Sequence, residues 1–363
     1  MSGPPWFIDQ LRSAVLHPRA FARTLAREHF GLAGVFVALL SGASLSLALD
    51  LLVVASRDVD PLAFLPRLIT DALFLAVRMA VTIALLGIAA SGALRLLHRA
   101  TLASLDQLVT AMAFATSPFI LAFPVALPAA LGPLTRSAAG VDLPDLGLVS
   151  TVALLLLAAF AAWSLGLDLL SLLPAPLAVA TALAVLAAST FAFGDEIARA
   201  RYVTYRYVPL LAPALAAEPA TGTPWTRGGI VLVVPKRWHL VTSVSELGRF
   251  ETDKDVLTVT TARGGVFLTP GDLADQISLA EVRGMTERAS WRDIVRVGDM
   301  IVVDDRNVGV YEGRRVALRQ FTTVRGTVAY ALLFRSIEPA DAERSLAEDA
   351  TIAATWRVGL AAP

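Results

Sequence analysis

The first half of the chain is patterned in long apolar runs rather than in alternating apolar and polar positions. The stretch 148–193 reads LVSTVALLLLAAFAAWSLGLDLL, then SLLPAP, then LAVATALAVLAASTFAF, and its only ionisable residue is Asp168. Each half supplies the roughly 20 apolar residues that cross a hydrocarbon core of about 30 Å. Pro174 and Pro176 break the helix between them. The stretch therefore predicts a transmembrane hairpin.

Three further apolar runs precede this hairpin. Together they make five predicted spans, at about 30–55, 70–97, 105–131, 148–170 and 175–193. The third contains Pro118, Pro124 and Pro128, so we expect a kinked helix, which membranes tolerate where neighbouring helices satisfy the freed backbone groups. Because five is odd, the two termini should lie on opposite sides of the bilayer.

The N-terminal segment 1–29 is basic and amphipathic. Pro18 suits the first turn of a short helix, and that helix carries Arg19, Arg23 and Arg27 on one face. These arginines either contact lipid phosphates from an interfacial helix or form a solvated positive flank of the first span. We expect the interfacial helix and keep the solvated flank as the alternative.

Basic residues beside the spans bear on orientation. With the N-terminus inside, six lie on the inner side (Arg12, Arg19, Arg23, Arg27, Arg95, Arg99) and six on the outer side (Arg57, Arg67, Arg136, Arg199, Arg201, Arg206). The first span usually dominates, and without the last three arginines the ratio is six to three. We predict a cytoplasmic N-terminus and an extracytoplasmic C-terminal domain, in a bacterial plasma (inner) membrane.

Charged side chains inside a membrane are costly and are often functional. Asp50 in the first span and Arg78 in the second are expected at a comparable depth, which predicts an intramembrane ion pair between them. The alternative is a proton- or ion-coupled site that also uses Asp71. Asp106 and Asp168 are expected near the inner ends of their spans, where they reach headgroups or water.

After the last span the chain becomes polar. The segment 198–227 begins ARARYVTYRY and continues as a linker rich in proline and alanine. Arginine and tyrosine are enriched where a membrane meets water. We therefore expect membrane-interface positions for Arg199, Arg201, Tyr202 and Tyr205.

The remaining segment 228–363 is predicted to be a soluble α+β domain, an antiparallel sheet covered by helices. Runs rich in β-branched residues predict strands at 230–234, 239–244, 255–261, 266–268, 300–303, 308–311, 315–324 and 327–334. Pro270 marks the start of one helix, and a final helix is expected over 340–356. The sequence DDRN at 304–307 is interpreted as a polar turn between two strands, in preference to a Ca²⁺ site.

Composition supports a membrane protein and offers little chemistry. The 363 residues are 56% hydrophobic and 17% charged, and 31 Lys plus Arg balance 31 Asp plus Glu, so nucleic acid is not an expected partner. The chain has no cysteine, and its four histidines form no HExxH motif. Walker A, GxSxG and GxGxxG sequences are also absent. We therefore expect no enzyme activity, no cofactor and no metal.

Two resemblances rest on short segments. HPRAFARTL before the first span, MAFATSPFIL in the third and AAWSLGLDLL in the fourth resemble the bacterial members of the Yip1 domain family, over residues 16–193. That resemblance implies a five-span membrane architecture. PKRWHLV, GTVAYALLF and IAATWRV resemble the Mog1/PsbP-type sandwich that includes DcrB-like envelope domains, over residues 234–357. That resemblance implies a binding fold.

The predicted fold class is therefore a five-span helical bundle (30–197) followed by a soluble α+β domain. The predicted function is a non-enzymatic membrane scaffold or adaptor, in envelope organisation, that presents an extracytoplasmic domain to a protein partner. The alternative is a small transporter or permease subunit that uses Arg78, Asp50 and Asp71. A membrane-embedded hydrolase is the least favoured, because motifs for a nucleophile and its base are missing.

Overall fold

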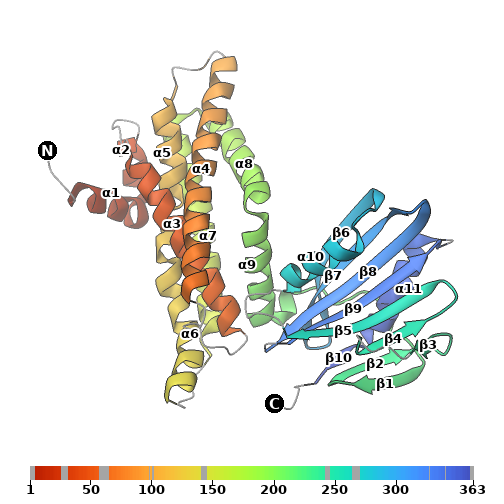
Figure 1. Ribbon diagram of the computed structural model, residues 1–363. Helices are drawn as coiled ribbons and strands as arrows, with labels where there is room; N and C mark the ends of the chain where they lie inside the picture. Colours follow the sequence, from red (N-terminus) through yellow and green to blue (C-terminus); the bar gives the residue numbers. More distant parts are fainter. Residues whose placement is uncertain are drawn as a thin grey trace. The chain divides into compact units, whose positions relative to one another are not determined.

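The computed structural model describes residues 5–25, 32–56, 65–97, 99, 102–139, 145–241, 246–263, 270–326, 328–339 and 341–359 (Figure 1). The chain forms two compact units, Met1–Val203 and Thr204–Pro363. The first is helical and the second is built on β-sheet. We call them the membrane unit and the sheet unit.

The membrane unit contains the five predicted spans. Its elements are α1 (Pro5–Leu16), α2 (Pro18–Leu25), α3 (Ala33–Ala55), α4 (Leu65–Leu96), α5 (Leu105–Ala115), the 3₁₀ turn η2 (Ser117–Leu121), α6 (Ala122–Ala139), α7 (Gly147–Leu172), α8 (Ala175–Ala192) and α9 (Gly194–Tyr207). Among the described residues, five helices are long and apolar enough to cross a membrane: α3, α4, the combined α5–η2–α6, α7 and α8. The five spans predicted from the sequence are therefore confirmed as apolar helices.

Small residues let these helices approach closely, as is usual where helices pack inside a membrane. A Cβ atom added at Gly42 of α3 would lie only 2.8 Å from the Cα of Ala76 in α4. A Cβ added at Gly87 of α4 would lie 2.4 Å from a methyl of Val109 in α5. These two contacts fix the depth at which α4 lies against its neighbours.

The third span breaks at η2, as its prolines predict. Pro124 has no N–H, so the carbonyl of Ile120 loses its helical partner. The hydroxyl of Ser44 in α3 donates to that carbonyl at 2.9 Å and accepts the N–H of Phe123 at 2.9 Å. A neighbouring helix thus satisfies both backbone groups at the break.

The sheet unit has two antiparallel sheets. A seven-stranded sheet has the order β3 (His239–Val241), β4 (Gly248–Glu251), β5 (Asp255–Arg263), β9 (Val328–Ile337), β8 (Arg314–Arg325), β7 (Met300–Tyr311) and β6 (Thr286–Val297). A three-stranded sheet has the order β1 (Thr223–Arg227), β2 (Ile230–Val234) and β10 (Arg357–Val358). The helices are α10 (Pro270–Glu281) and α11 (Ala342–Ala354), with a 3₁₀ turn η3 (Pro209–Leu211) before β1. The α+β class is as predicted.

The two helices cover opposite faces of the large sheet. Adjacent residues of a strand point to opposite faces, and Gln320 donates to the Ala274 carbonyl of α10 while Arg319 donates to the Leu346 carbonyl of α11. The face under α11 also carries the main core, where Trp356 and Phe321 are fully buried.

One prediction for the large sheet, the polar turn at 304–307, is wrong. The predicted turn at 304–307 is the middle of β7, which runs unbroken from Met300 to Tyr311. Asp304 is bound by Arg319, Asp305 by Arg292 at 2.9 Å, and Asn307 by Ser290 at 2.8 Å, in each case from a neighbouring strand. Polar residues continue a buried strand when each one finds a partner across the ladder.

The structure places the predicted linker in the sheet unit. The N–H of Arg296 donates to the Pro213 carbonyl at 2.8 Å, and the N–H of Ala220 donates to the Thr351 carbonyl at 2.8 Å. Strand β1 then pairs along its whole length with β2. A domain cut at residue 228 would therefore remove β1. The predicted strand at 266–268 lies outside the described residues.

Candidate functional site: the charged cluster of α9

Helix α9 is rich in charged residues, unlike the apolar helix α8 that precedes it. It follows α8 after a break at Phe193 and begins at Gly194, with Asp195 and Glu196 in its first turn. Carboxylates in the first turn interact favourably with the helix dipole. Its sequence GDEIARARYVTYRY alternates acidic, basic and apolar residues, so different faces of α9 offer different chemistry.

Arg78 of α4 contacts the junction of α8 and α9. Its guanidinium donates to the Glu196 carboxylate at 2.9 Å and to the carbonyl of Ala192. That carbonyl lies in the last turn of α8, where backbone oxygens have no helical partner. The guanidinium also lies 5.5 Å from the ring centroid of Phe193. Arg78 therefore holds the end of α8 and the start of α9 against α4.

Asp50 of α3 is bound by Arg199, one turn further along α9. The Arg199 guanidinium donates to its Oδ1 at 3.1 Å, and Asp50 is only 3% exposed. Charge-assisted hydrogen bonds of this kind are about twice as strong as neutral ones. We call the four residues Asp50, Arg78, Glu196 and Arg199 the α9 cluster.

This arrangement replaces the direct pair of Asp50 with Arg78 predicted from the sequence. The two residues are not at a comparable depth. Helices α3 and α4 run in opposite directions (Figure 1), and Gly42 packs against Ala76, so Arg78 lies beside residue 40. Asp50 is about ten residues, or about 15 Å, further along the axis. Each charge therefore takes its partner from α9.

The predicted interface residues separate into different environments. On α2, Arg19 and Arg23 are exposed while Phe21 and Leu25 are buried, an amphipathic arrangement, and Arg27 lies outside the described residues. On α9, Arg201 is exposed and Tyr205 is half-buried.

The other two predicted interface residues, Arg199 and Tyr202, turn inward. Arg199 binds Asp50, and Tyr202 is buried at 5% exposure. Asp71, which the transporter alternative required, pairs with Arg67 at 3.4 Å on its own helix.

Asp168 departs from its expected setting. Rather than reaching headgroups or water, it is buried within the membrane unit at 2% exposure. Several hydroxyls of the bundle are buried as well: Ser41, Ser44, Ser46, Thr110, Ser117, Ser150, Thr151 and Ser164. The interior of the bundle is thus more polar than its apolar sequence predicts.

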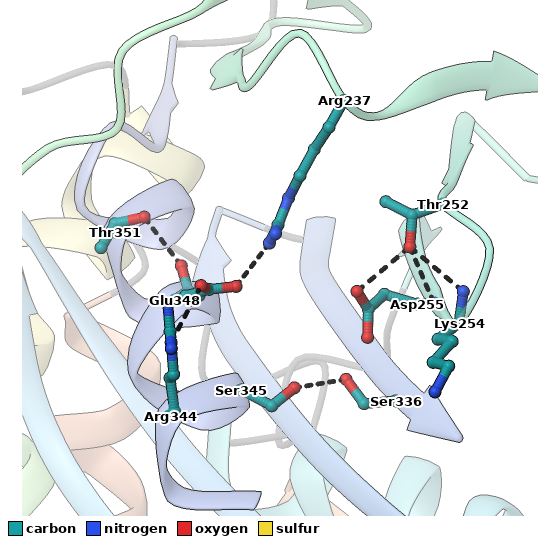
Figure 2. Close-up of polar contacts among 9 residues, drawn as sticks. All are labelled: Arg237, Thr252, Lys254, Asp255, Ser336, Arg344, Ser345, Glu348 and Thr351. Atoms are coloured by element: carbon teal, nitrogen blue, oxygen red, sulfur yellow. Dashed lines mark hydrogen bonds and ion pairs between the residues drawn. The ribbon is translucent and has the colours of Figure 1, made fainter. Parts of the chain in front are cut away.

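A second polar group lies on the sheet unit, between α11 and the β2–β3 and β4–β5 connections (Figure 2). Arg237 and Arg344 both reach Glu348. Ser336 of β9 and Ser345 of α11 share a hydrogen bond of 2.6 Å, and Thr252 bonds Asp255 at 3.1 Å. We call the residues of Figure 2 the polar face. The side chains of Arg344 and Arg237 are 79% and 52% exposed.

Beneath the polar face lies a buried charged pair. Arg319 forms two hydrogen bonds with the Asp304 carboxylate, at 2.9 and 2.7 Å. The neighbouring Asp349 of α11 is 5% exposed. Burial raises the pKa of Asp349 well above its usual range, and the charges of Asp255 and Glu348 raise it further, against the opposing effect of Arg319. This carboxyl resists ionisation.

Neither group has the make-up of a metal site. Within the described ranges, no three His, Cys, Asp or Glu side chains are close enough to hold a metal ion. The α9 cluster can hold helices together and neutralise charge, and the polar face can offer arginine, carboxylate and hydroxyl groups to a partner. The sequence analysis gave Glu196 no role, because this residue lies just after the last predicted span.

Comparison with known proteins finds likeness in solved structures only. A solution structure of cyanobacterial PsbP (CyanoP) from Synechocystis sp. PCC 6803 aligns with a TM-score of 0.30 and 12% identity, covering 41% of this chain and 99% of that one. A crystal structure from Bacteroides thetaiotaomicron aligns with a TM-score of 0.28 and 15% identity, covering 39% of this chain and half of that one. No protein family and no curated protein matches, so the Yip1 resemblance stays a prediction.

Proposed function

We propose that the protein is a non-enzymatic, membrane-anchored adaptor. Its membrane unit holds the chain in the bilayer, and its sheet unit binds a protein partner in the organisation of a bacterial envelope. The observation that carries this proposal is that each unit has its own hydrophobic core. A unit with its own core can present a binding surface without help from the bundle.

The segment that connects the two units is partly ordered. The chain is bound to the bundle through Arg199 and to the sheet unit from Pro213 onwards. Part of the segment between these residues is helical or 3₁₀.

The adaptor orientation that we propose has the N-terminus in the cytoplasm and the sheet unit outside it. Because the chain has no cysteine, single cysteines can report sidedness. Arg344→Cys on the polar face should react with a membrane-impermeant maleimide in intact cells. Arg19→Cys on α2 is the matched control and should react only after permeabilisation. The reverse pattern would place the sheet unit in the cytoplasm.

Partner binding can be tested on the polar face. A photo-crosslinking residue at position 237 should yield a defined adduct in membranes, and the same residue at 288, on the exposed part of β6, is the control. Removal of the sheet unit should abolish recovery of the same partner. If the membrane unit alone retains that partner, the sheet unit is not the binding module.

Two observations favour the transporter alternative: the buried Asp168 and the proline-broken third span. Against it, Arg78 and Asp50 are engaged by α9, and Asp71 by Arg67. Substrate-dependent proton uptake into proteoliposomes that contain the purified chain, lost when Asp168 is changed to Asn, would favour this alternative over the adaptor.

A further inference from the structure

Asp168 is a buried carboxyl for which the described residues provide no counter-charge. It lies one turn before the end of α7 and is 2% exposed. Its Oδ1 has no hydrogen-bond partner. Within the described part of the chain, no Lys, Arg or His forms an ion pair with it.

Ser164 lies one helical turn before Asp168. Residues four apart share one face of a helix, so the hydroxyl and the carboxyl project to the same side of α7. Ser164 is also buried, and its Oγ lacks a partner as well. The other buried residues of this end of α7 are apolar: Ala161, Leu165, Leu169 and Leu172. Two unsatisfied polar groups therefore share one buried face.

Among the described side chains of the elements that pack against α7, none brings a compensating charge to this face. Helix α2 carries Arg19 and Arg23, which are both exposed, and α3 carries Asp50, which is bound to Arg199. Helix α5 carries Asp106 in its first turn, and α8 has no charged residue. Arg136 of α6 lies outside the described side chains.

An ionised carboxylate without water or a cation is strongly disfavoured in an apolar interior, and a protein avoids the penalty by keeping the group neutral. Acidic residues inside membranes commonly serve as proton-carrying groups. We propose that Asp168 is a proton-binding site of the membrane unit, which carries a proton at neutral pH and exchanges it with water, with Ser164 as its polar neighbour. This goes beyond the adaptor role and does not depend on it.

Infrared difference spectroscopy on the full chain in lipid nanodiscs tests the proposal. Wild type minus Asp168→Asn should show the carbonyl band of a protonated carboxylic acid at pH 7, and this band should shift when H₂O is replaced by D₂O. Asp106→Asn is the matched control, and the acid band assigned to Asp168 should be absent from its difference spectrum. Carboxylate bands in the Asp168 difference, or an acid band that D₂O leaves unshifted, would overturn the proposal.

Two further measurements sharpen the result. Asp168→Glu keeps the acid and should keep a protonated-acid band, even if Asp168→Asn folds poorly; loss of that band counts against the site. Dicyclohexylcarbodiimide, which reacts with protonated carboxyls in apolar surroundings, should label residue 168, with labelling falling as pH rises. Labelling that rises with pH would contradict a proton-carrying Asp168. Because no Lys or Arg lies between Arg136 and Arg199, chymotrypsin should be used to locate the label.

Discussion

The two units bury charge in different ways. In the membrane unit, Asp50 of α3 pairs with Arg199 of α9, and Arg78 of α4 pairs with Glu196 of α9, so both pairs join helices far apart in the sequence. In the sheet unit, Asp304 and Arg319 lie on adjacent strands of one ladder. Breaking a pair in the first case should loosen one helix, whereas breaking one in the second should weaken the whole sheet. Pairs between distant helices and pairs between adjacent strands are therefore expected to respond differently to mutation.

The largest expected effect concerns where the sheet unit begins. A fragment of residues 209–363 should unfold cooperatively, and one of residues 228–363 should be less stable by more than about 3 kcal/mol. The shorter fragment lacks β1 and four partly buried side chains that pack against the core, Leu215, Ala217, Ala220 and Trp225, the last edge-on to Phe250 with ring centroids 5.5 Å apart. Burying one large apolar side chain completely contributes about 1.5–3 kcal/mol, so losing these four together with a paired strand should exceed about 3 kcal/mol. Urea denaturation of both measures the difference. Equal stability would mean that β1 is dispensable.

Next in size is the buried pair of the sheet unit. Arg319→Met removes both hydrogen bonds to the Asp304 carboxylate and leaves it with the more distant Arg306, whose Nε lies 3.8 Å away. This change should cost about 3–5 kcal/mol in the 209–363 fragment. Adding Asp304→Leu should recover much of that loss, because an apolar pair can replace a buried ion pair. The comparison of single and double variants by urea denaturation decides this. If the double variant is no more stable than the single variant, the poorly compensated carboxylate is not the cause of the lost stability.

Within the membrane unit, Ser44→Ala tests the proline break. It removes the partner of two buried backbone groups, which should cost about 1–3 kcal/mol. Thermal unfolding in detergent should show a lower Tm. Ser46→Ala, a buried serine two residues away, is the matched control and should change the Tm less. A larger effect at Ser46 would contradict the role assigned to Ser44.

The smallest expected change is a gain in stability. The raised pKa of Asp349 means that the unfolded chain loses this proton more readily than the folded one. The stability of the sheet unit therefore falls as pH rises from the ordinary aspartate pKa through the raised value. Asp349→Asn should increase the free energy of unfolding at pH 7, with the gain vanishing below about pH 4. A variant destabilised equally at both pH values would argue for a structural role of the carboxylate.

Much of the fold could be predicted from the sequence. The spans could be predicted because crossing a bilayer demands a minimum apolar length, and strands β8 and β9 because the runs 315–324 and 327–334 have the composition of strands. Strand β6 and the middle of β7 could not be predicted, because many of their residues are polar. These residues lie in strands because they pair across the ladder, as Arg292 does with Asp305 and Ser290 with Asn307.

The candidate site was harder to predict than the fold. Asp50 and Arg78 stood out as charges within apolar runs, but their partners depend on helix depth. That depth is set by close contacts such as Gly42 with Ala76, which carry no signal in a single sequence. Glu196 lay in a polar segment, where a charge does not stand out.

The central claim is that α9 supplies the counter-charges of the bundle. Double-mutant cycles on thermal unfolding in detergent test it directly, with Asp50→Asn, Arg78→Gln, Glu196→Gln and Arg199→Gln as the single changes. Coupling energies of about 0.5–3 kcal/mol are expected for residues in direct contact, and we expect them for Asp50 with Arg199 and for Arg78 with Glu196. Asp50 with Arg78 should show none. Strong coupling between Asp50 and Arg78, with none to α9, would contradict the claim.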